Sequence, residues 1–398
     1  MDITCSRCGS EFGVTLFQFG HGVRCLCGAE FDYPGTDLRA GHVLVQGEAK
    51  IISHEDRCVG EMQAPSSQPQ QGAKLLFQIA SAAGEQLFAD LDRARQITGQ
   101  WADKNLTEAL VDAALSASLY HLAETGCWGE ANRMPSQEFW RIAGPLLELG
   151  TLQRHARLKP RGYAGDYQML HWIWTDYCCD HPLGWAFDRY FQRQAAPQAV
   201  RSRTQQIAVA LVAQCLQANT PNYHVVSVGS GPATDISQAL AVLPMNRRPS
   251  LQATLLDLDP EALEFSERQV TPLLGPGKLR CLRENLFRLP QNPNVKNLLG
   301  TPDFLVCSGL FDYLPDEAAT AMLRLFWGRL AEGGTMMVGN FAPHNPTRAY
   351  MEWIGNWYLT YRTGRDLERL AMGAGISQDR FSIGSEALGV DLILTARK

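Results

Sequence analysis

The sequence lacks any apolar stretch long enough to cross a bilayer as a helix, which takes about 20 residues. Asp2 follows Met1 and cysteines come soon after, which is unlike a secretory signal. It has no run of lysine and arginine, and its formal net charge is −5. This charge does not favour a nucleic-acid partner, which would usually leave a basic footprint. We therefore expect a cytoplasmic protein with no membrane span that acts on small molecules.

The length of 398 residues and an ordinary globular composition suit two or three domains. Internal repeats are absent. We predict a small cysteine-bearing module at 1–60 and a linker rich in Pro, Ser and Gln at 61–73. Apolar residues at helical spacing then predict a helical domain at 74–220. An α/β domain is expected at 221–398.

The most informative segment, 224–233, reads His-Val-Val-Ser-Val-Gly-Ser-Gly-Pro-Ala. It predicts a buried strand that runs into a glycine turn, and a second strand ends at Asp257. Strand, Gly-x-Gly turn, helix, strand and acid form a pattern typical of α/β sheets that bind the ribose of a nucleoside cofactor. Gly229 and Gly231 let the backbone turn tightly and approach a ligand closely. Asp257 could then accept from both ribose hydroxyls.

A third glycine, expected in a dinucleotide-binding turn, is missing, because Pro232 and Ala233 follow Gly231. Its absence argues against NAD and FAD. A cofactor without phosphate fits better, and S-adenosylmethionine is the obvious one. A lone Gly-x-Gly turn can also be purely structural.

The rest of the C-terminal half continues an α/β order. A third strand at 279–286 ends near Asn285, whose side chain could bond the adenine amino group. A helix near 317–330 ends in glycines suited to a helix C-terminus. Further strands are expected at 302–308 and 335–341, with a closing hairpin formed by 380–387 and 389–397.

In this order the motifs resemble class I S-adenosylmethionine-dependent methyltransferases, over about residues 200 to 398. The resemblance implies an α/β fold: a Rossmann-like, seven-stranded methyltransferase sheet with a helical lid domain beside it. It also implies S-adenosylmethionine as the cofactor. The implied cofactor contacts are Gly229, Ser230, Gly231, Asp257, Leu258, Asn285, Leu286 and Ser308.

Three further motifs resemble a subgroup of bacterial methyltransferases, over roughly 135 to 398. They are Gly-Tyr-Ala-Gly-Asp at 162–166, Ser-Gly-Leu-Phe-Asp-Tyr-Leu at 308–314, and Met-Glu-x-x-x-x-Trp-x-Leu-x-Tyr-Arg at 351–362. Some members of that subgroup are assigned to making 3-hydroxy fatty acid methyl esters. The resemblance implies O-methylation of a small carboxylic acid. N- or O-methylation of a specialised metabolite is the alternative.

The first of these motifs lies in a loop between predicted helices. Two glycines and a proline at 159–167 suggest a specific backbone path. Asp166 could cap the helix that follows. The loop could equally be a lid, with Arg161, Tyr163 and Tyr167 facing the cofactor or the acceptor.

Acceptor-side residues are expected in loops at the carboxyl ends of the strands. A carboxylate acceptor needs no base, whereas an alcohol, phenol or ammonium group does. The candidate catalytic residues are His344, Asp312 and Tyr163. The candidate substrate-binding residues are Arg161, Tyr163, Tyr313, Arg348, Trp353, Trp357 and Arg362. These residues also have structural interpretations. The histidine could be an ordinary loop residue, the aspartate could cap a turn or helix, the arginines could form surface salt bridges, and the aromatic rings could pack in the core.

Four cysteines crowd the first 27 residues: Cys5, Cys8, Cys25 and Cys27. Cys5 and Cys8 form one closely spaced pair, or knuckle, and Cys25 and Cys27 form a second. Two cysteine knuckles in so short a segment predict a zinc-ribbon-like module with one structural zinc ion. His21, or more remotely His42 or His54, could replace one ligand. Reduced thiols in a small β-hairpin are the alternative. A zinc ribbon could also dock RNA or protein, so a macromolecule-binding methyltransferase is the rival hypothesis.

Overall fold

The computed structural model describes residues 2–4, 11–13, 23–24, 30–31, 68–218, 222–244, 246 and 251–398. The chain forms two compact units. One comprises Met1–Ala164, Cys178–Tyr190 and Ala349–Tyr358, and the other comprises Gly165–Tyr177, Phe191–Arg348 and Leu359–Lys398. We call them the helical unit and the sheet unit.

Among the described residues, four short strands precede the first helix. β1 (Asp2–Thr4) pairs with β2 (Glu11–Gly13), and β3 (Val23–Arg24) pairs with β4 (Glu30–Phe31), both antiparallel. Cys5, Cys8, Cys25 and Cys27, the predicted zinc ligands, lie outside the described residues. The zinc-ribbon hypothesis therefore stays a prediction.

The helical unit is built on buried apolar positions at helical spacing. It contains α1 (Gln68–Ile97), α2 (Lys104–Glu124), α3 (Glu130–Leu147), α4 (Thr151–Leu158), most of α6 (Pro182–Gln192) and a π-helical turn, η5 (Tyr350–Ile354). Leu87, Leu115 and Phe139 pack from α1, α2 and α3 with at most 1% of each side chain exposed. α1 begins at Gln68, inside the segment 61–73 that was predicted as a linker. The polar residues of that segment form the first turns of the helix, and Leu76, which follows them, is buried.

The sheet unit contains a mixed seven-stranded sheet, as the resemblance implied. Its strands are β5 (Tyr223–Val228), β6 (Leu251–Asp257), β7 (Leu279–Arg283), β8 (Phe304–Cys307), β9 (Thr335–Phe341), β10 (Phe381–Ser385) and β11 (Asp391–Arg397). Their order is β10-β11-β9-β8-β5-β6-β7. The five strands from β5 to β9 run parallel, while β11 is antiparallel to β9 and β10. The closing hairpin is thus confirmed.

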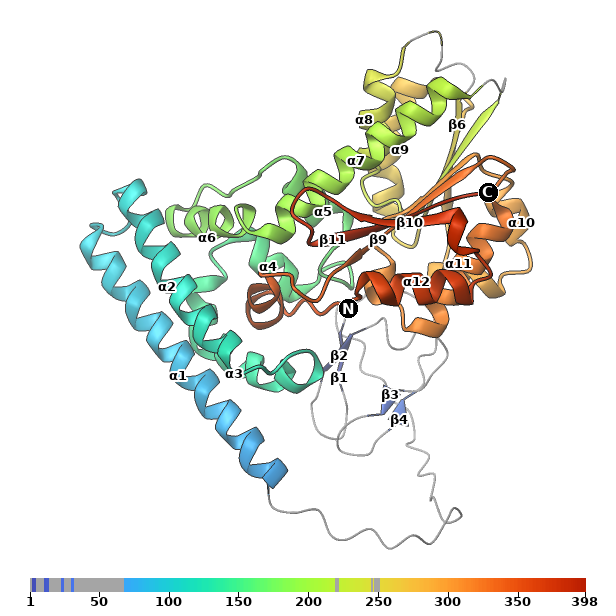
Figure 1. Cartoon of the computed structure of the whole chain (residues 1–398). Coiled ribbons are helices and arrows are strands. Elements are labelled where there is room, and N and C mark those ends of the chain that lie inside the picture. Colours follow the sequence, from blue (N-terminus) through green and yellow to red (C-terminus); the bar gives the residue numbers. More distant parts are fainter. Residues whose placement is uncertain are drawn as a thin grey trace, which may run out of the picture. The chain divides into compact units, whose positions relative to one another are not determined.

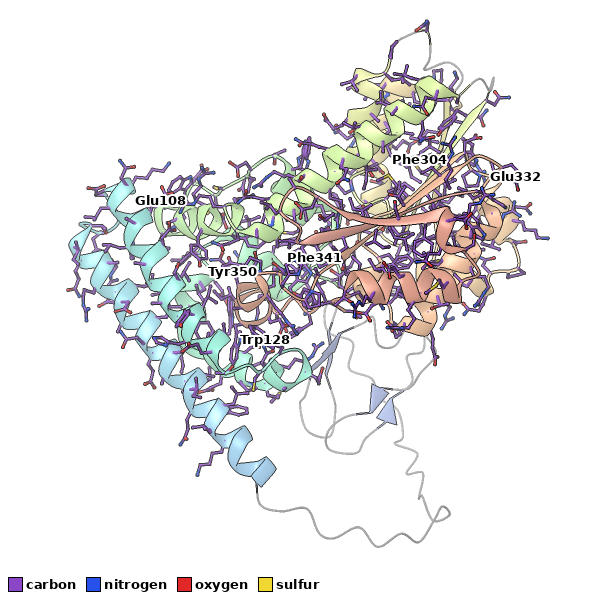
Figure 2. All side chains as sticks on the ribbon, viewed as in Figure 1. Glu108, Trp128, Phe304, Glu332, Phe341 and Tyr350 are labelled. Carbon is purple, nitrogen blue, oxygen red and sulfur yellow. The ribbon has the colours of Figure 1, made fainter. Side chains whose placement is uncertain are left out.

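Helices cover both faces of this sheet. The helices of the sheet unit are α5 (Tyr167–Trp174), α7 (Ala195–Gln217), α8 (Thr234–Val242), α9 (Pro260–Leu274), α10 (Val295–Leu299), α11 (Asp316–Arg329) and α12 (Gly364–Gly373), with short turns η3 (Leu286–Gln291), η4 (Phe311–Tyr313) and η6 (Gln378–Arg380). α7, α8 and α9 lie on one face, and α11 and α12 on the other (Figure 1). Phe304 of β8 and Phe341 of β9 lie among the packed side chains of this unit (Figure 2).

The two compact units divide the chain differently from the predicted boundary at residue 220. α7 belongs to the sheet unit because Ile207 and Leu211 join one buried cluster with Val225 of β5. Conversely, Ala349–Tyr358 belongs to the helical unit. There, Glu352 Oε2 accepts from the Gly129 backbone N–H (2.7 Å) and from Asn132 Nδ2 (2.8 Å). Such long-range ties leave no local pattern in the sequence.

Candidate functional site

The glycine turn after β5 has a backbone path that requires glycine. Gly229 and Gly231 have φ angles of 68° and 50°, in the left-handed region that L side chains rarely adopt. The N–H groups of Gly229 and Ser230 donate to the Leu256 carbonyl oxygen at 2.8 and 3.1 Å. The turn is therefore fixed against the neighbouring strand β6, in a backbone path that other residues rarely adopt.

Asp257 at the end of β6 holds this turn directly. Its Oδ2 accepts from the Gly231 N–H at 2.8 Å, and its Oδ1 accepts from the Asp259 N–H at 3.0 Å. The residue is 3% exposed, and burial raises the pKa of its carboxyl to about 6. A carboxylate has about four lone-pair sites, so each oxygen keeps acceptor capacity beyond these two bonds. Asp257 can thus shape the turn and still accept from ligand hydroxyls.

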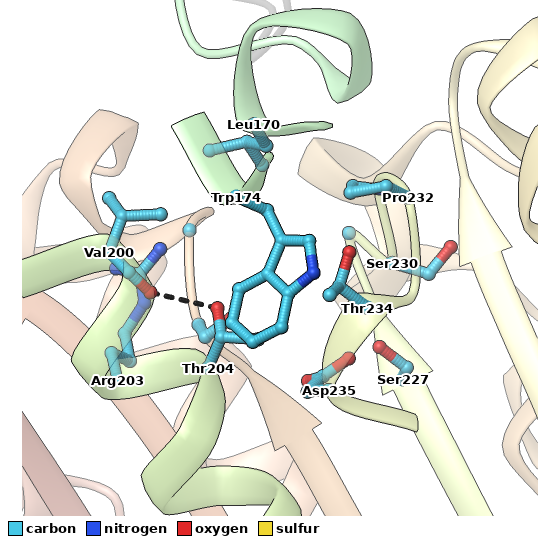
Figure 3. Close-up of a pocket in the computed structure, with 13 residues that line it drawn as sticks. Leu170, Trp174, Val200, Arg203, Thr204, Ser227, Ser230, Pro232, Thr234 and Asp235 are labelled. Atoms are coloured by element: carbon cyan, nitrogen blue, oxygen red, sulfur yellow. Dashed lines mark hydrogen bonds between the residues drawn. The ribbon is translucent and has the colours of Figure 1, made fainter. Parts of the chain in front are cut away.

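A pocket opens beside the glycine turn, within the sheet unit (Figure 3). α5, α7, the turn itself, the start of α8 and the segment after β8 all contribute to its wall. The lining residues are Leu170, Trp174, Val200, Arg203, Thr204, Ser227, Gly229, Ser230, Pro232, Thr234, Asp235, Ser308 and Gly309. This is the carboxyl end of β5 and β8, where the chain order of the sheet reverses. Ligands of open α/β sheets bind at such a switch point.

Buried polar groups in the pocket wall have unused hydrogen-bonding capacity. Arg203 of α7 is 4% exposed, and its Nη1 forms an ion pair with Asp391 Oδ2 on β11. Its Nε–H, however, has no hydrogen-bond partner, and neither has the Ser230 hydroxyl, which is also buried. Unsatisfied buried donors are uncommon in folded proteins. Two in one pocket wall are consistent with a polar ligand.

Helix α5 borders the same region. Asp166 caps it by accepting from the Met169 N–H at 2.9 Å, as the sequence allowed. The Leu170 side chain lies 3.4 Å from where a Cβ on Gly231 would stand. Tyr167 and His171 pack on Phe265 of α9, with ring centroids 5.4 and 4.9 Å apart. These contacts fix α5 against the glycine turn on one side and α9 on the other.

The structure brings several of the predicted cofactor residues together. Gly229, Ser230 and Ser308 line one pocket, and Leu286 lies beside Gly229, 3.5 Å from where a Cβ on it would stand. Asn285 caps η3, because its Oδ1 accepts from the Phe287 N–H at 3.1 Å. The predicted role of Asn285 at an adenine ring stays a prediction, as does that of Leu258.

Sequence reasoning missed Trp174, Arg203 and Asp235 in the pocket wall. Asp235 could have been found, since it follows Gly231 by four residues in the first turn of the next helix. Trp174 and Arg203 come from helices outside the strand-turn-strand pattern, so no spacing marks them.

Asp312, a predicted catalytic residue, ties η4 to β9. Its Oδ1 accepts from the Phe341 N–H at 2.7 Å and from Asn340 Nδ2 at 3.0 Å. Burial, together with the nearby charge of Asp391, raises the pKa of its carboxyl to about 8. The alternative that Asp312 caps the following helix is wrong, because Pro315 occupies that position at α11.

Arg362, a predicted substrate-binding residue, is 2% exposed, and all of its N–H donors form hydrogen bonds within the sheet unit. Its Nε and Nη2 donate to Asp316 Oδ1, its Nη1 donates to Asn340 Oδ1 and the Phe311 carbonyl, and its Nη2 also donates to the Leu314 carbonyl. A guanidinium has five N–H donors, and these bonds use five. This conformation therefore leaves no donor of Arg362 for a substrate.

The other predicted acceptor residues lie in different settings. His344 is exposed, and its Nε2 lies 2.8 Å from the Gly389 carbonyl oxygen, to which it donates. The Arg348 guanidinium lies 4.5 Å from the centre of the Tyr361 ring. Trp353 and Trp357 are buried within the helical unit, in keeping with the core-packing alternative. Tyr313 is half-buried, as are Arg161 and Tyr163 of the helical unit. Their proposed roles at an acceptor remain predictions.

Among the residues that the structure describes, no group of three or more His, Cys, Asp or Glu side chains is placed to hold a metal ion. None of the helices in the described ranges combines the length and the apolar character that crossing a bilayer requires.

Comparison with known proteins identifies a shared fold. No protein-family model matches the sequence, and no curated protein matches it. A possible exported protein from Bordetella parapertussis, known from a crystal structure, is 16% identical with a TM-score of 0.52. The alignment covers 84% of this chain and 99% of that one. At this identity the similarity shows the fold alone.

More distant structural similarities include two methyltransferases. Magnesium protoporphyrin IX methyltransferase from Synechocystis PCC 6803, solved with bound S-adenosylhomocysteine, is 19% identical with a TM-score of 0.39. That alignment covers 52% of this chain and 88% of the other. An O-methyltransferase family protein from Burkholderia thailandensis is 15% identical with a TM-score of 0.38, covering 83% and 95%. Both TM-scores are too low to support an inference about this chain.

Proposed function

We propose that the protein is an S-adenosylmethionine-dependent methyltransferase of class I. The observation that carries this proposal is the glycine turn, tied to Asp257 and opening into a pocket at the carboxyl ends of β5 and β8. A turn that lacks the third glycine suits a nucleoside cofactor without phosphate. Direct titration with S-adenosylhomocysteine tests the proposal: the intact chain should bind it saturably, and Asp257→Ala should lose this binding.

The residues present fit the cofactor at both of its ends. The ribose would lie on Asp257, over Gly229 to Gly231, with the adenine near Asn285. The amino-acid end would enter the pocket, where the Arg203 Nε–H and the Ser230 hydroxyl lack partners. The cofactor supplies an electrophilic methyl group on its sulfonium. The protein's part is to align an acceptor with that group and to exclude water.

We propose a small carboxylic acid as the acceptor. We also propose that the chain belongs to the bacterial subgroup of which some members are assigned to making 3-hydroxy fatty acid methyl esters. The subgroup motifs support shared architecture more than a shared acceptor. Asp166 caps α5, Glu352 binds backbone and side-chain donors near α3, and Arg362 crosslinks the sheet unit. Arg348, which is half-buried and whose guanidinium lies 4.5 Å from the centre of the Tyr361 ring, is the cation that we assign to orient a carboxylate.

We expect Arg348→Ala to lower kcat/KM for a carboxylic acid acceptor about ten- to a hundredfold, the cost of one or two charge-assisted hydrogen bonds. Affinity for S-adenosylhomocysteine should stay nearly unchanged. Steady-state kinetics with labelled cofactor and calorimetry would measure the two quantities. Arg369→Ala removes an exposed arginine of the same unit and serves as the control.

His344→Ala separates carboxylate acceptors from protic ones. Since a carboxylate needs no base, turnover should survive this change. Loss of turnover, with a pH profile showing a base near the usual histidine pKa of about 6.5, would refute the carboxylate acceptor. An alcohol or amine would then be the better acceptor.

We also propose one structural zinc ion on Cys5, Cys8, Cys25 and Cys27, supported by two cysteine knuckles in a segment too small for its own core. Elemental analysis of protein purified without chelator should find about one zinc per chain. Absence of metal, together with free alkylation of these thiols in the native protein, would rule the site out. Cys215 and Cys307, buried in the sheet unit, provide the unreactive comparison.

A further inference from the structure

The pocket beside the glycine turn joins an aromatic face to a buried carboxylate. Figure 3 shows the Trp174 indole standing between the side chains of α7 and those of the glycine turn and α8. Asp235 lines the same pocket from the first turn of α8 and is 8% exposed. An aromatic face and a carboxylate are the two groups that attract a cation in a partly dry site.

The charges around the pocket favour a cation over an anion. Arg203 is the one arginine in the pocket wall, and its guanidinium is already paired with the buried Asp391. Asp235 forms no salt bridge with another described residue, and its Oδ1 accepts from the Ile236 N–H at 2.9 Å. Burial raises the pKa of the Asp235 carboxyl to about 6, while the charge of Arg203 offsets this rise only in part. The pocket thus holds one buried carboxylate whose charge a ligand could balance.

The position of Trp174 is set by the rest of α5. Asp166 caps the helix, Leu170 rests against Gly231, and Tyr167 and His171 pack on Phe265. A half-buried indole presented by a helix anchored in this way loses little side-chain freedom when a ligand arrives.

We propose that Trp174 and Asp235 form a cation site, and that Trp174 thereby sets a preference for the charged cofactor over its neutral product. The inference rests on the proposed function. S-adenosylmethionine carries a positive sulfonium, which becomes a neutral sulfide in S-adenosylhomocysteine. A site that discriminates between the two limits product inhibition. The ammonium group of the amino-acid end is the second cation that the site could take.

The test measures dissociation constants by calorimetry for S-adenosylmethionine, S-adenosylhomocysteine and 5′-methylthioadenosine, which lacks the amino-acid end. We expect Trp174→Leu to weaken binding of S-adenosylmethionine relative to S-adenosylhomocysteine by about three- to thirtyfold, the range of a cation–π contact. Asp235→Asn, which keeps an acceptor for the Ile236 N–H, should shift the same ratio. Trp174→Phe, which keeps an aromatic ring, should retain most of the preference for S-adenosylmethionine over S-adenosylhomocysteine.

Trp172→Leu is the matched control, because Trp172 lies on the same helix but stacks on Tyr177 and is not among the pocket residues. It should leave the ratio unchanged. If Trp174→Leu instead weakens S-adenosylhomocysteine relative to 5′-methylthioadenosine, the site binds the ammonium group, which both cofactor forms carry, and the proposed preference for S-adenosylmethionine is overturned. An equal change for all three ligands, or no change, overturns the cation site. If the unaltered protein binds none of them, the proposed function itself fails.

Discussion

Arg362→Ala is expected to lower the free energy of unfolding by about 3–5 kcal/mol, because it leaves several buried hydrogen-bond acceptors without a donor, at about 1–3 kcal/mol each. The change strips hydrogen bonds from Asn340 and from the carbonyl groups of Phe311 and Leu314, which lie between β8 and α11. Asp316 also loses its buried partner, although half of its own side chain is exposed. Urea denaturation followed by circular dichroism would measure the loss.

Arg369→Ala provides the control, because Arg369 contacts the same Asp316 from a solvent-exposed position. Its removal should leave the free energy of unfolding almost unchanged. An Arg362→Ala protein of normal stability that fails only in acceptor binding would restore the substrate-binding role and contradict the structural one.

Asp257→Ala is expected to reduce affinity for S-adenosylhomocysteine by at least about tenfold, since each hydrogen bond to a charged acceptor contributes about 1.5–3 kcal/mol. Two ribose hydroxyls would lose their acceptor, and Gly231 would lose the bond that fixes the turn. Calorimetry gives the affinity directly. Asp259→Ala is the comparison: this residue caps α9, so the change should affect stability but not affinity. Unchanged binding in Asp257→Ala would remove the ribose assignment.

The same carboxyl predicts a pH dependence. Its pKa rises from 3.8 to about 6 on folding, so between these values the folded chain binds more protons than the unfolded chain. Its contribution to stability therefore falls as pH rises through this window. The affinity for the ligand changes with pH in the opposite direction, because ligand hydroxyls donate more strongly to the charged carboxylate. We expect binding to strengthen as pH rises through about 6 and then to level off, as titrations between pH 5 and 8 would show.

The sequence predicted the parts of the site that local pattern encodes. The turn at Gly229 and Gly231 and the acid Asp257 were found because strand, turn and acid follow one another within a short segment. The closing hairpin was likewise visible as two adjoining strand patterns. The capping role of Asp166 followed from its place before a helix.

What the sequence could not predict depends on contacts between distant segments. Arg362 is buried only because η4, β9 and α11 converge around it. Ala349–Tyr358 returns to the helical unit through Glu352, a contact across more than two hundred residues. Trp174 and Arg203 reach the pocket from helices that lie before the sheet in sequence. No spacing rule links such residues to a glycine turn.

The central claim is most directly tested by titrating the purified chain with S-adenosylhomocysteine in a calorimeter, with NAD as the comparison ligand. The site predicts saturable binding of S-adenosylhomocysteine, lost in Asp257→Ala, and no binding of NAD. A chain that binds NAD, or that shows no binding of S-adenosylhomocysteine near neutral pH, would contradict the assignment of a methyl-donor site to the glycine turn and its pocket.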